Sequence, residues 1–116
     1  MRVVIQRVSS ASVTIGGAVR SQIGPGLLVL LGVGHDDDTA DIDYLVKKTA
    51  ALRIFDDEAG VMNRSVVDVG GDIIVVSQFT LMAATRKGNR PSYIAAAGHE
   101  VAVPMYEEFC RRMKNI

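Results

Sequence analysis

At 116 residues, with 48% hydrophobic and 22% charged side chains, the sequence has the size and composition of a single soluble globular domain. Its 13 basic and 13 acidic residues cancel, which argues against a protein that coats nucleic acid non-specifically but leaves room for a local basic patch. The longest apolar run, from Leu27, is too short to span a bilayer, the first ten residues lack a signal-peptide core, and the lone Cys110 forms no intrachain disulfide, so we expect a cytoplasmic location and no membrane partner.

The first third of the chain is rich in Val, Ile and Leu and predicts strands. Residues 12–23 are expected to form a hairpin, because Gly16 and Gly17 can take the positive φ angles of a tight turn. The run GLLVLLGVG, residues 26–34, is apolar without interruption, which is typical of a strand buried on both faces.

Two helices are expected in the rest of the chain. The first follows the acidic run 36–38, which together with Thr39 offers caps for its beginning. A turn-rich segment then leads to a strand that begins at Asp72. The second helix lies near the C-terminal end, and Pro104 is expected only near its beginning because proline lacks the N–H that a helix interior needs. Two helices among at least five strands predict a mixed α/β fold in one domain, residues 1–116.

Several reactive side chains have plainer explanations than chemistry. His35 and His99 are the only histidines and belong to different predicted elements, so neither a metal nor a cofactor is expected. The carboxylates at 36–38 are explained by a helix N-terminus. Cys110 falls on the apolar stripe of the second helix, which favours a packed thiol over a nucleophile.

The strand that begins at Asp72 ends differently. Both of its faces are apolar through Val76, so it is expected to be a central strand of the sheet. Polar and aromatic side chains then begin where the strand would leave the core, and sheets tend to place ligand sites at such strand ends. By the alternation of a strand, Gln78 and Thr80 are expected to share one face, and Ser77 and Phe79 the other. The four side chains in question are Ser77, Gln78, Phe79 and Thr80.

A basic loop follows this strand end. Its cations can bind phosphates, and Gly88 lets the backbone approach them closely. The plainer alternative is a solvated loop after an ordinary strand, and the residue pattern alone leaves both open. The cations are Arg86, Lys87 and Arg90.

At this point the sequence resembles the D-aminoacyl-tRNA deacylase family over essentially all of its 116 residues. The resemblance implies a homodimeric cytoplasmic enzyme of layered β-sheets with two helices on one side, which needs no metal and hydrolyses the ester that joins a D-amino acid, or glycine, to tRNA. It also implies catalytic roles for residues 77–80 and contacts to the substrate or tRNA from Arg7, Arg86, Lys87, Arg90, Pro91 and Ser92. The segments that carry the resemblance are QRV (6–8), ASVTI (11–15), GLLVLLGV (26–33), RIFDDEAG (53–60), VVSQFTL (75–81) and NRPSY (89–93).

One part of the family pattern is missing from these residues. Members continue past the second helix into further strand and a motif of the form Asn-x-Gly-Pro-x-Thr, whose Gly-Pro pair reaches into the partner's pocket and excludes L-amino acids. By resemblance, Arg7 would brace that loop of the partner. No such motif occurs here, and we expect the sequence to be a fragment that dimerises poorly and discriminates poorly between D- and L-substrates.

The mechanism is left open by the residues themselves. Thr80 is a possible nucleophile, yet its own segment supplies no base to activate a hydroxyl. We favour an oxyanion hole made by backbone N–H groups around Phe79 and Thr80, with the ribose 2′-hydroxyl of the tRNA helping to activate water. A small-ester hydrolase with a Thr or Ser nucleophile remains an alternative, which a hydrogen bond from a histidine to Thr80 would favour. A non-catalytic RNA-binding module is the other, and an occluded strand end would favour it.

Overall fold

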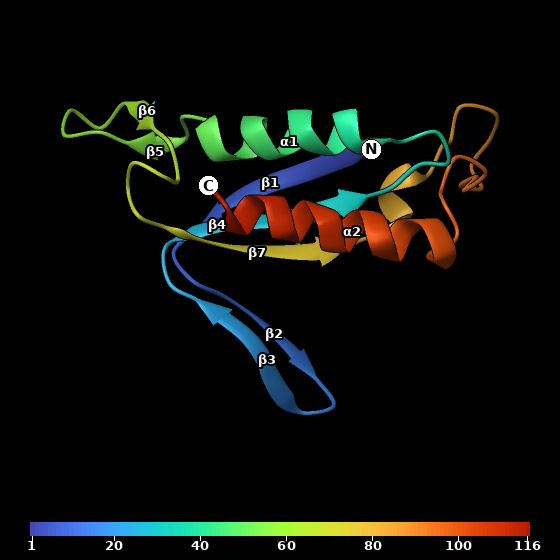
Figure 1. Cartoon of the computed structure of the whole chain (residues 1–116), viewed down its shortest axis with the longest axis horizontal. Helices are drawn as coiled ribbons and strands as arrows, with labels where there is room; N and C mark the ends of the chain where they lie inside the picture. The colour runs from blue at the N-terminus through green and yellow to red at the C-terminus, as the bar shows by residue number, and fades with distance from the viewer.

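Segments that lie far apart in the sequence form one three-stranded sheet in the computed structural model, which describes all 116 residues (Figure 1). Two further two-stranded sheets, β2 with β3 and β5 with β6, flank it. The elements in chain order are β1 (Arg2–Val8), β2 (Ala11–Ile15), β3 (Ala18–Ile23), β4 (Gly26–Gly32), α1 (Thr39–Ala51), β5 (Phe55–Asp56), β6 (Met62–Arg64), β7 (Asp72–Ser77), the 3-10 turn η1 (Phe79–Met82) and α2 (His99–Lys114).

Strand β4 is the centre of the main sheet, which has the order β1-β4-β7. It runs antiparallel to β1 and parallel to β7, and the register places Leu31 opposite Ser77. The expectation that β7 is central is therefore wrong, because β7 pairs only with β4 and its other edge has no strand partner. Of its four apolar side chains only that of Ile74 is buried, and the other three are half-buried.

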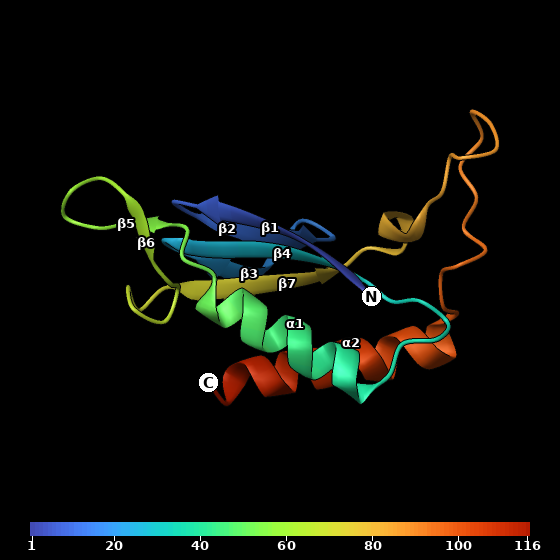
Figure 2. The ribbon, with the colours of Figure 1, turned by 90° about the horizontal axis from the view of Figure 1, so that it is seen from above.

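Both helices lie on the same side of the main sheet, as Figure 2 shows, which confirms the expected mixed α/β fold. The core forms where they meet the sheet: Leu27, Val29 and Leu31 of β4 are fully buried, as are Ile42 of α1 and Phe109 of α2. Removing each such side chain from water contributes about 1.5–3 kcal/mol. The side chains on the other face of β4, those of Leu28 and Leu30, are only half-buried, so the expected burial on both faces holds fully for one face.

The β2–β3 hairpin extends away from this core (Figure 1). Gly16 and Gly17 join its strands with φ angles of 60° and 80°, as the sequence predicts. These left-handed angles strain any residue that carries a Cβ. The hairpin is thus built by local sequence.

Side-chain caps explain the beginning of α1, whereas the beginning of α2 differs from expectation. Asp38 caps α1, its side chain accepts hydrogen bonds from the N–H groups of Ala40 and Asp41, and the carboxylate of Asp41 accepts from the N–H of Asp38 in return. Pro104 differs from expectation, because α2 begins five residues before it, at His99. Neither helix is long and apolar enough to cross a membrane.

Candidate active site

The end of β7 forms a short turn that continues directly from the sheet. The N–H of Gln78 donates to the carbonyl of Leu31 at 2.7 Å, and the chain then winds into η1, where the N–H of Leu81 donates to the carbonyl of Gln78 at 3.2 Å. Strand alternation therefore stops at Gln78, and the expectation of two strand faces beyond it is wrong. We call residues 77–80 the tip.

Two polar side chains of the tip are bound to each other. The amide Nε2 of Gln78 donates to the hydroxyl Oγ1 of Thr80 at 2.5 Å. Ser77, Phe79 and Thr80 are exposed, and 53% of the Phe79 side chain is open to solvent. The tip is thus accessible, which removes the condition that would favour a non-catalytic RNA-binding module.

The backbone of the tip offers free donors. The N–H groups of Phe79 and Thr80 come first in η1, where a short helix has no carbonyl of its own for them to bond. Neither has a hydrogen-bond acceptor elsewhere in the chain. Two adjacent amide donors on an exposed, sheet-anchored turn can stabilise a developing negative charge.

No base contacts the hydroxyl of Thr80, whose hydrogen-bond partner is the Gln78 amide. The imidazole Nε2 of His35 lies 2.6 Å from the carbonyl oxygen of Ile94, and His99 is the first residue of α2. The histidine contact that would favour a threonine nucleophile is therefore absent.

An aromatic contact holds the chain after the basic loop against the tip. The ring of Tyr93 lies 4.9 Å from that of Phe79, centroid to centroid, at an interplanar angle of 32°. Further along, the N–H of Ala97 donates to the carbonyl of Val33 at 2.9 Å. Tyr93 was not among the expected site residues, although it ends the NRPSY segment; the sequence places it 14 residues from Phe79 and cannot show the contact.

The basic loop, residues 85–91, projects from the body of the protein beyond the tip (Figure 2). Its base is closed by two backbone hydrogen bonds between Ala84 and Ser92, at 2.8 and 2.7 Å, with Pro91 beside them. The three cations are exposed and form no ion pair within the chain, so their charges are available to phosphates.

Arg7 does not join this group within one chain. Its guanidinium Nη1 donates to the carbonyl of Ile54 at 2.8 Å and lies 3.5 Å from the carboxylate of Asp56. In the sheet it pairs with Leu27, whereas the tip adjoins the opposite end of β4. At about 3.4 Å per residue, the five residues from Arg2 to Arg7 place it about 17 Å farther along β1.

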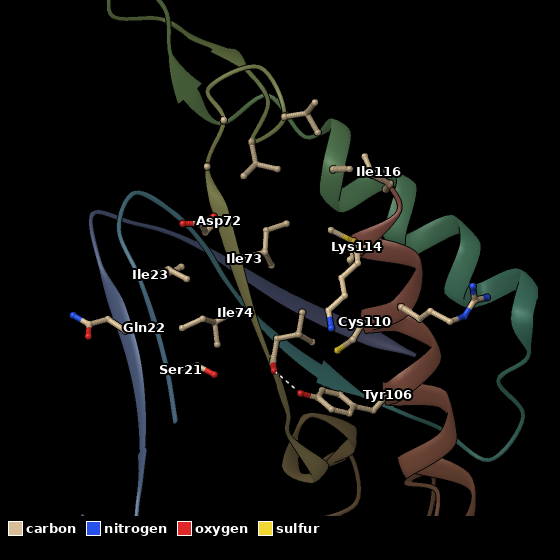
Figure 3. Close-up of a pocket in the computed structure, with 18 of the residues that line it drawn as sticks. Ser21, Gln22, Ile23, Asp72, Ile73, Ile74, Tyr106, Cys110, Lys114 and Ile116 are labelled. Carbon is tan, nitrogen blue, oxygen red and sulfur yellow. Dashed lines mark hydrogen bonds between the residues drawn. The ribbon is translucent and has the colours of Figure 1, made fainter. Parts of the chain in front are cut away.

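A large hollow lies away from the tip. It has a volume of about 1120 Å³ and lies between β3, β7 and α2, at the unpaired edge of β7 (Figure 3). In it, the hydroxyl of Tyr106 donates to the carbonyl of Val75 at 2.8 Å, and burial raises the pKa of both Tyr106 and the Cys110 thiol. We call it the edge groove; it is lined by the half-buried Cys110, whose thiol is less enclosed than the expected packed position, and by none of the tip residues.

Comparison with known proteins gives a consistent result. Residues 4–116 match the family model described as D-Tyr-tRNA(Tyr) deacylase. A D-aminoacyl-tRNA deacylase of Bacteroides thetaiotaomicron is 60% identical over 115 residues, which cover 99% of this chain and 77% of the relative. A deacylase of the same name from Phocaeicola vulgatus is 58% identical over 113 residues, covering 97% and 75%.

Two solved structures share the fold. One, named c-Myc DNA Unwinding Element Binding Protein, superposes with a TM-score of 0.94 at 40% identity and covers 99% of this chain and 77% of its own. A probable eukaryotic D-amino acid tRNA deacylase superposes with a TM-score of 0.78 at 18% identity, covering 97% and 66%, and supports the fold alone.

Proposed function

This chain belongs to the D-Tyr-tRNA(Tyr) deacylase family and hydrolyses the ester of D-aminoacyl-tRNA, and we propose that the tip carries out this hydrolysis. In the reaction, water adds to the ester carbonyl, the resulting oxyanion collapses, and the bond to the ribose oxygen breaks. A free D-amino acid and tRNA are released. The proposal assigns this site to Ser77, Gln78, Phe79 and Thr80.

The unpaired N–H groups of Phe79 and Thr80 carry the proposal. They form the oxyanion hole, because they are adjacent, exposed and fixed by the sheet bond from Gln78 to Leu31. The Thr80 hydroxyl is held by the Gln78 amide and contacts no base, so the proposal gives the nucleophilic role to water rather than to Thr80. The 2′-hydroxyl of the terminal ribose, next to the ester, helps to activate the attacking water.

The basic loop binds the tRNA end in this proposal. Arg86, Lys87 and Arg90 are exposed and unpaired, and each can neutralise a phosphate. The backbone of Ser92 closes the base of the loop next to Pro91, and the ring of Tyr93 packs against that of Phe79. The phosphates and the aminoacyl group are thereby bound on the same end of the sheet.

The working form is proposed to be a cytoplasmic homodimer, since tRNA charging takes place in the cytoplasm and the family pattern is dimeric. Exclusion of L-amino acids is assigned to a Gly-Pro motif of that pattern, which does not occur in residues 1–116. Arg7 is proposed to act across the dimer, because it lies at the far end of β1 from its own tip.

Replacement of Phe79 by proline tests the oxyanion hole. Proline removes the N–H, and its ring suits the first position of a turn that follows the extended backbone of Gln78. Phe79→Ala is the matched control, because it removes the same aromatic ring and keeps the N–H. Loss of one such donor lowers kcat by about 10²- to 10³-fold in comparable sites.

We therefore expect Phe79→Pro to hydrolyse D-tyrosyl-tRNA about 10²-fold or more slowly than Phe79→Ala in single-turnover assays. Circular dichroism establishes that both variants are folded. Equal rates for the two variants would contradict the assignment of the Phe79 N–H to the oxyanion.

A further inference from the structure

The 3-10 turn η1 is held from the side by the first strand of the protein. The guanidinium Nη1 of Arg2 donates to the carbonyl of Leu81 at 3.1 Å, across 79 residues of sequence. Arg2 forms no ion pair, and this is its one side-chain hydrogen bond. Leu81 is the third residue of η1, so this contact fixes the turn whose first two N–H groups are free.

Strand β4 lies between Arg2 and η1 and has a glycine, which has no side chain, where the turn packs on it. Gly32 pairs with Arg2 in the sheet, and a Cβ at Gly32 would lie 2.9 Å from the Cβ of Leu81 and 3.2 Å from the sulfur of Met82. A Cβ at Gly34 would lie 3.1 Å from the terminal methyl of Met82. The turn therefore packs directly on the β4 backbone, in space that only glycine leaves.

We infer that Arg2 and Gly32 are positioning residues for deacylation, which set the location of η1 and hence of the Phe79 and Thr80 N–H groups. The inference rests on the proposed function of the tip. Neither residue is assigned a contact with the substrate. Arg2 acts through the carbonyl of Leu81, and Gly32 acts by allowing the close approach of that residue.

The expected effect of a side chain at Gly32 follows from how far it would displace Leu81. Ordinary Cβ contacts begin near 3.4 Å, whereas a Cβ added at Gly32 would lie 2.9 Å from the Cβ of Leu81. An alanine at Gly32 would therefore displace Leu81 by about 0.5 Å. Catalytic geometry is held within about 0.5 Å, and a misplacement of 1 Å can lower a rate by about 10²-fold. We expect Gly32→Ala to lower kcat by about tenfold.

Arg2 variants test the same idea with an exposed side chain, whose removal leaves the core intact. Arg2→Ala is expected to lower kcat several-fold with KM unchanged, because RNA binding through the basic loop is untouched. Arg2→Lys keeps a donor and is expected to recover part of the loss. Hydrogen exchange of the Leu81 N–H, which donates to the carbonyl of Gln78 just before η1, is expected to accelerate in Arg2→Ala and less so in Arg2→Lys.

The chain offers a matched control for each substitution. Arg20 forms no side-chain hydrogen bond or ion pair, and a Cβ at Gly24 would meet nothing within 4 Å. Arg20→Ala and Gly24→Ala are expected to keep the wild-type kcat. All variants are compared in D-tyrosyl-tRNA hydrolysis after thermal unfolding has established the folded fraction.

The outcomes separate this inference from the proposed function. Equal rates for Phe79→Pro and Phe79→Ala overturn the tip assignment itself. If those two differ but Arg2→Ala and Gly32→Ala retain the wild-type kcat, the positioning role alone is overturned. A raised KM with unchanged kcat in Arg2→Ala also overturns it, since Arg2 would then bind RNA. The Arg2 pair decides the matter if Gly32→Ala is partly unfolded.

Discussion

Replacement of Thr80 by alanine separates a threonine nucleophile from a backbone oxyanion hole. In the structure the Thr80 hydroxyl accepts one hydrogen bond, from the Gln78 amide, at an exposed position. Losing such a bond costs about 0.5–1.5 kcal/mol, which corresponds to a roughly 2- to 13-fold effect if all of it is felt in the transition state. Removal of a true serine nucleophile in a well-studied protease costs about 10⁶-fold. The two mechanisms therefore differ by several orders of magnitude.

The assay is single-turnover release of D-tyrosine from D-tyrosyl-tRNA by wild type, Thr80→Ala and Thr80→Ser. We expect Thr80→Ala to lose no more than about tenfold, and Thr80→Ser, which retains a hydroxyl for Gln78, to be near wild type. A loss of 10⁴-fold or more in a folded Thr80→Ala, restored by Thr80→Ser, would identify Thr80 as the nucleophile.

Three further expectations concern the charge of the basic loop, the stability of the fold at low pH, and dimerisation together with selectivity against L-substrates. Charge reversal at Arg86, Lys87 and Arg90 should weaken tRNA binding and lower the slope of log affinity against log salt by about 0.7–0.9 for each phosphate that the loop no longer neutralises, and an unchanged slope would place the tRNA elsewhere. Arg111 and Arg112 hold the pKa of Glu108 at about 2, below its ordinary 4.5, so this carboxylate stabilises the fold above about pH 4.5 and loses that effect as the pH falls towards 2. Glu108→Gln should accordingly be less stable than wild type in urea unfolding at pH 6, with a gap that narrows towards pH 2; a constant gap would contradict this. Finally, residues 1–116, which contain no Asn-x-Gly-Pro-x-Thr motif, should sediment mainly as a monomer and spare L-aminoacyl-tRNA poorly; a stable dimer that spares L-substrates would contradict this.

Elements defined by neighbouring residues could be predicted well. The Gly16-Gly17 turn, the apolar strand β4 and the acidic cap of α1 each depend on a few adjacent side chains, and all three occur in the structure. The family resemblance is confirmed over residues 4–116. Strand β7 shows the limit of such prediction: its apolar sequence indicates a strand, but its place at the edge of the sheet depends on where the other strands lie.

The sequence indicates which segment forms the candidate site, but not the conformation of that segment or its contacts. Strand alternation beyond Ser77 assumed that the strand continues, whereas the sheet ends at the bond from Gln78 and the chain winds into η1. The contacts of Tyr93 with Phe79 and of Arg2 with Leu81 join residues that are distant in sequence, so periodicity carries no sign of them. The resemblance gives Arg7 a contact with the substrate or the partner, whereas its contacts within this chain are with Ile54 and Asp56 and link β1 to β5.

The most direct test of the account is the hydrolysis of D-tyrosyl-tRNA whose terminal adenosine lacks the 2′-hydroxyl. The ester is formed on the 3′-oxygen in both the ribose and the 2′-deoxyribose substrate, so the tip and the basic loop can bind both in the same way. Because Thr80 contacts no base, the account predicts that the 2′-deoxy substrate binds normally and is not hydrolysed by the wild-type protein. Hydrolysis of the two substrates at the same rate would contradict the role of the 2′-hydroxyl, since the protein would then supply the activating group itself.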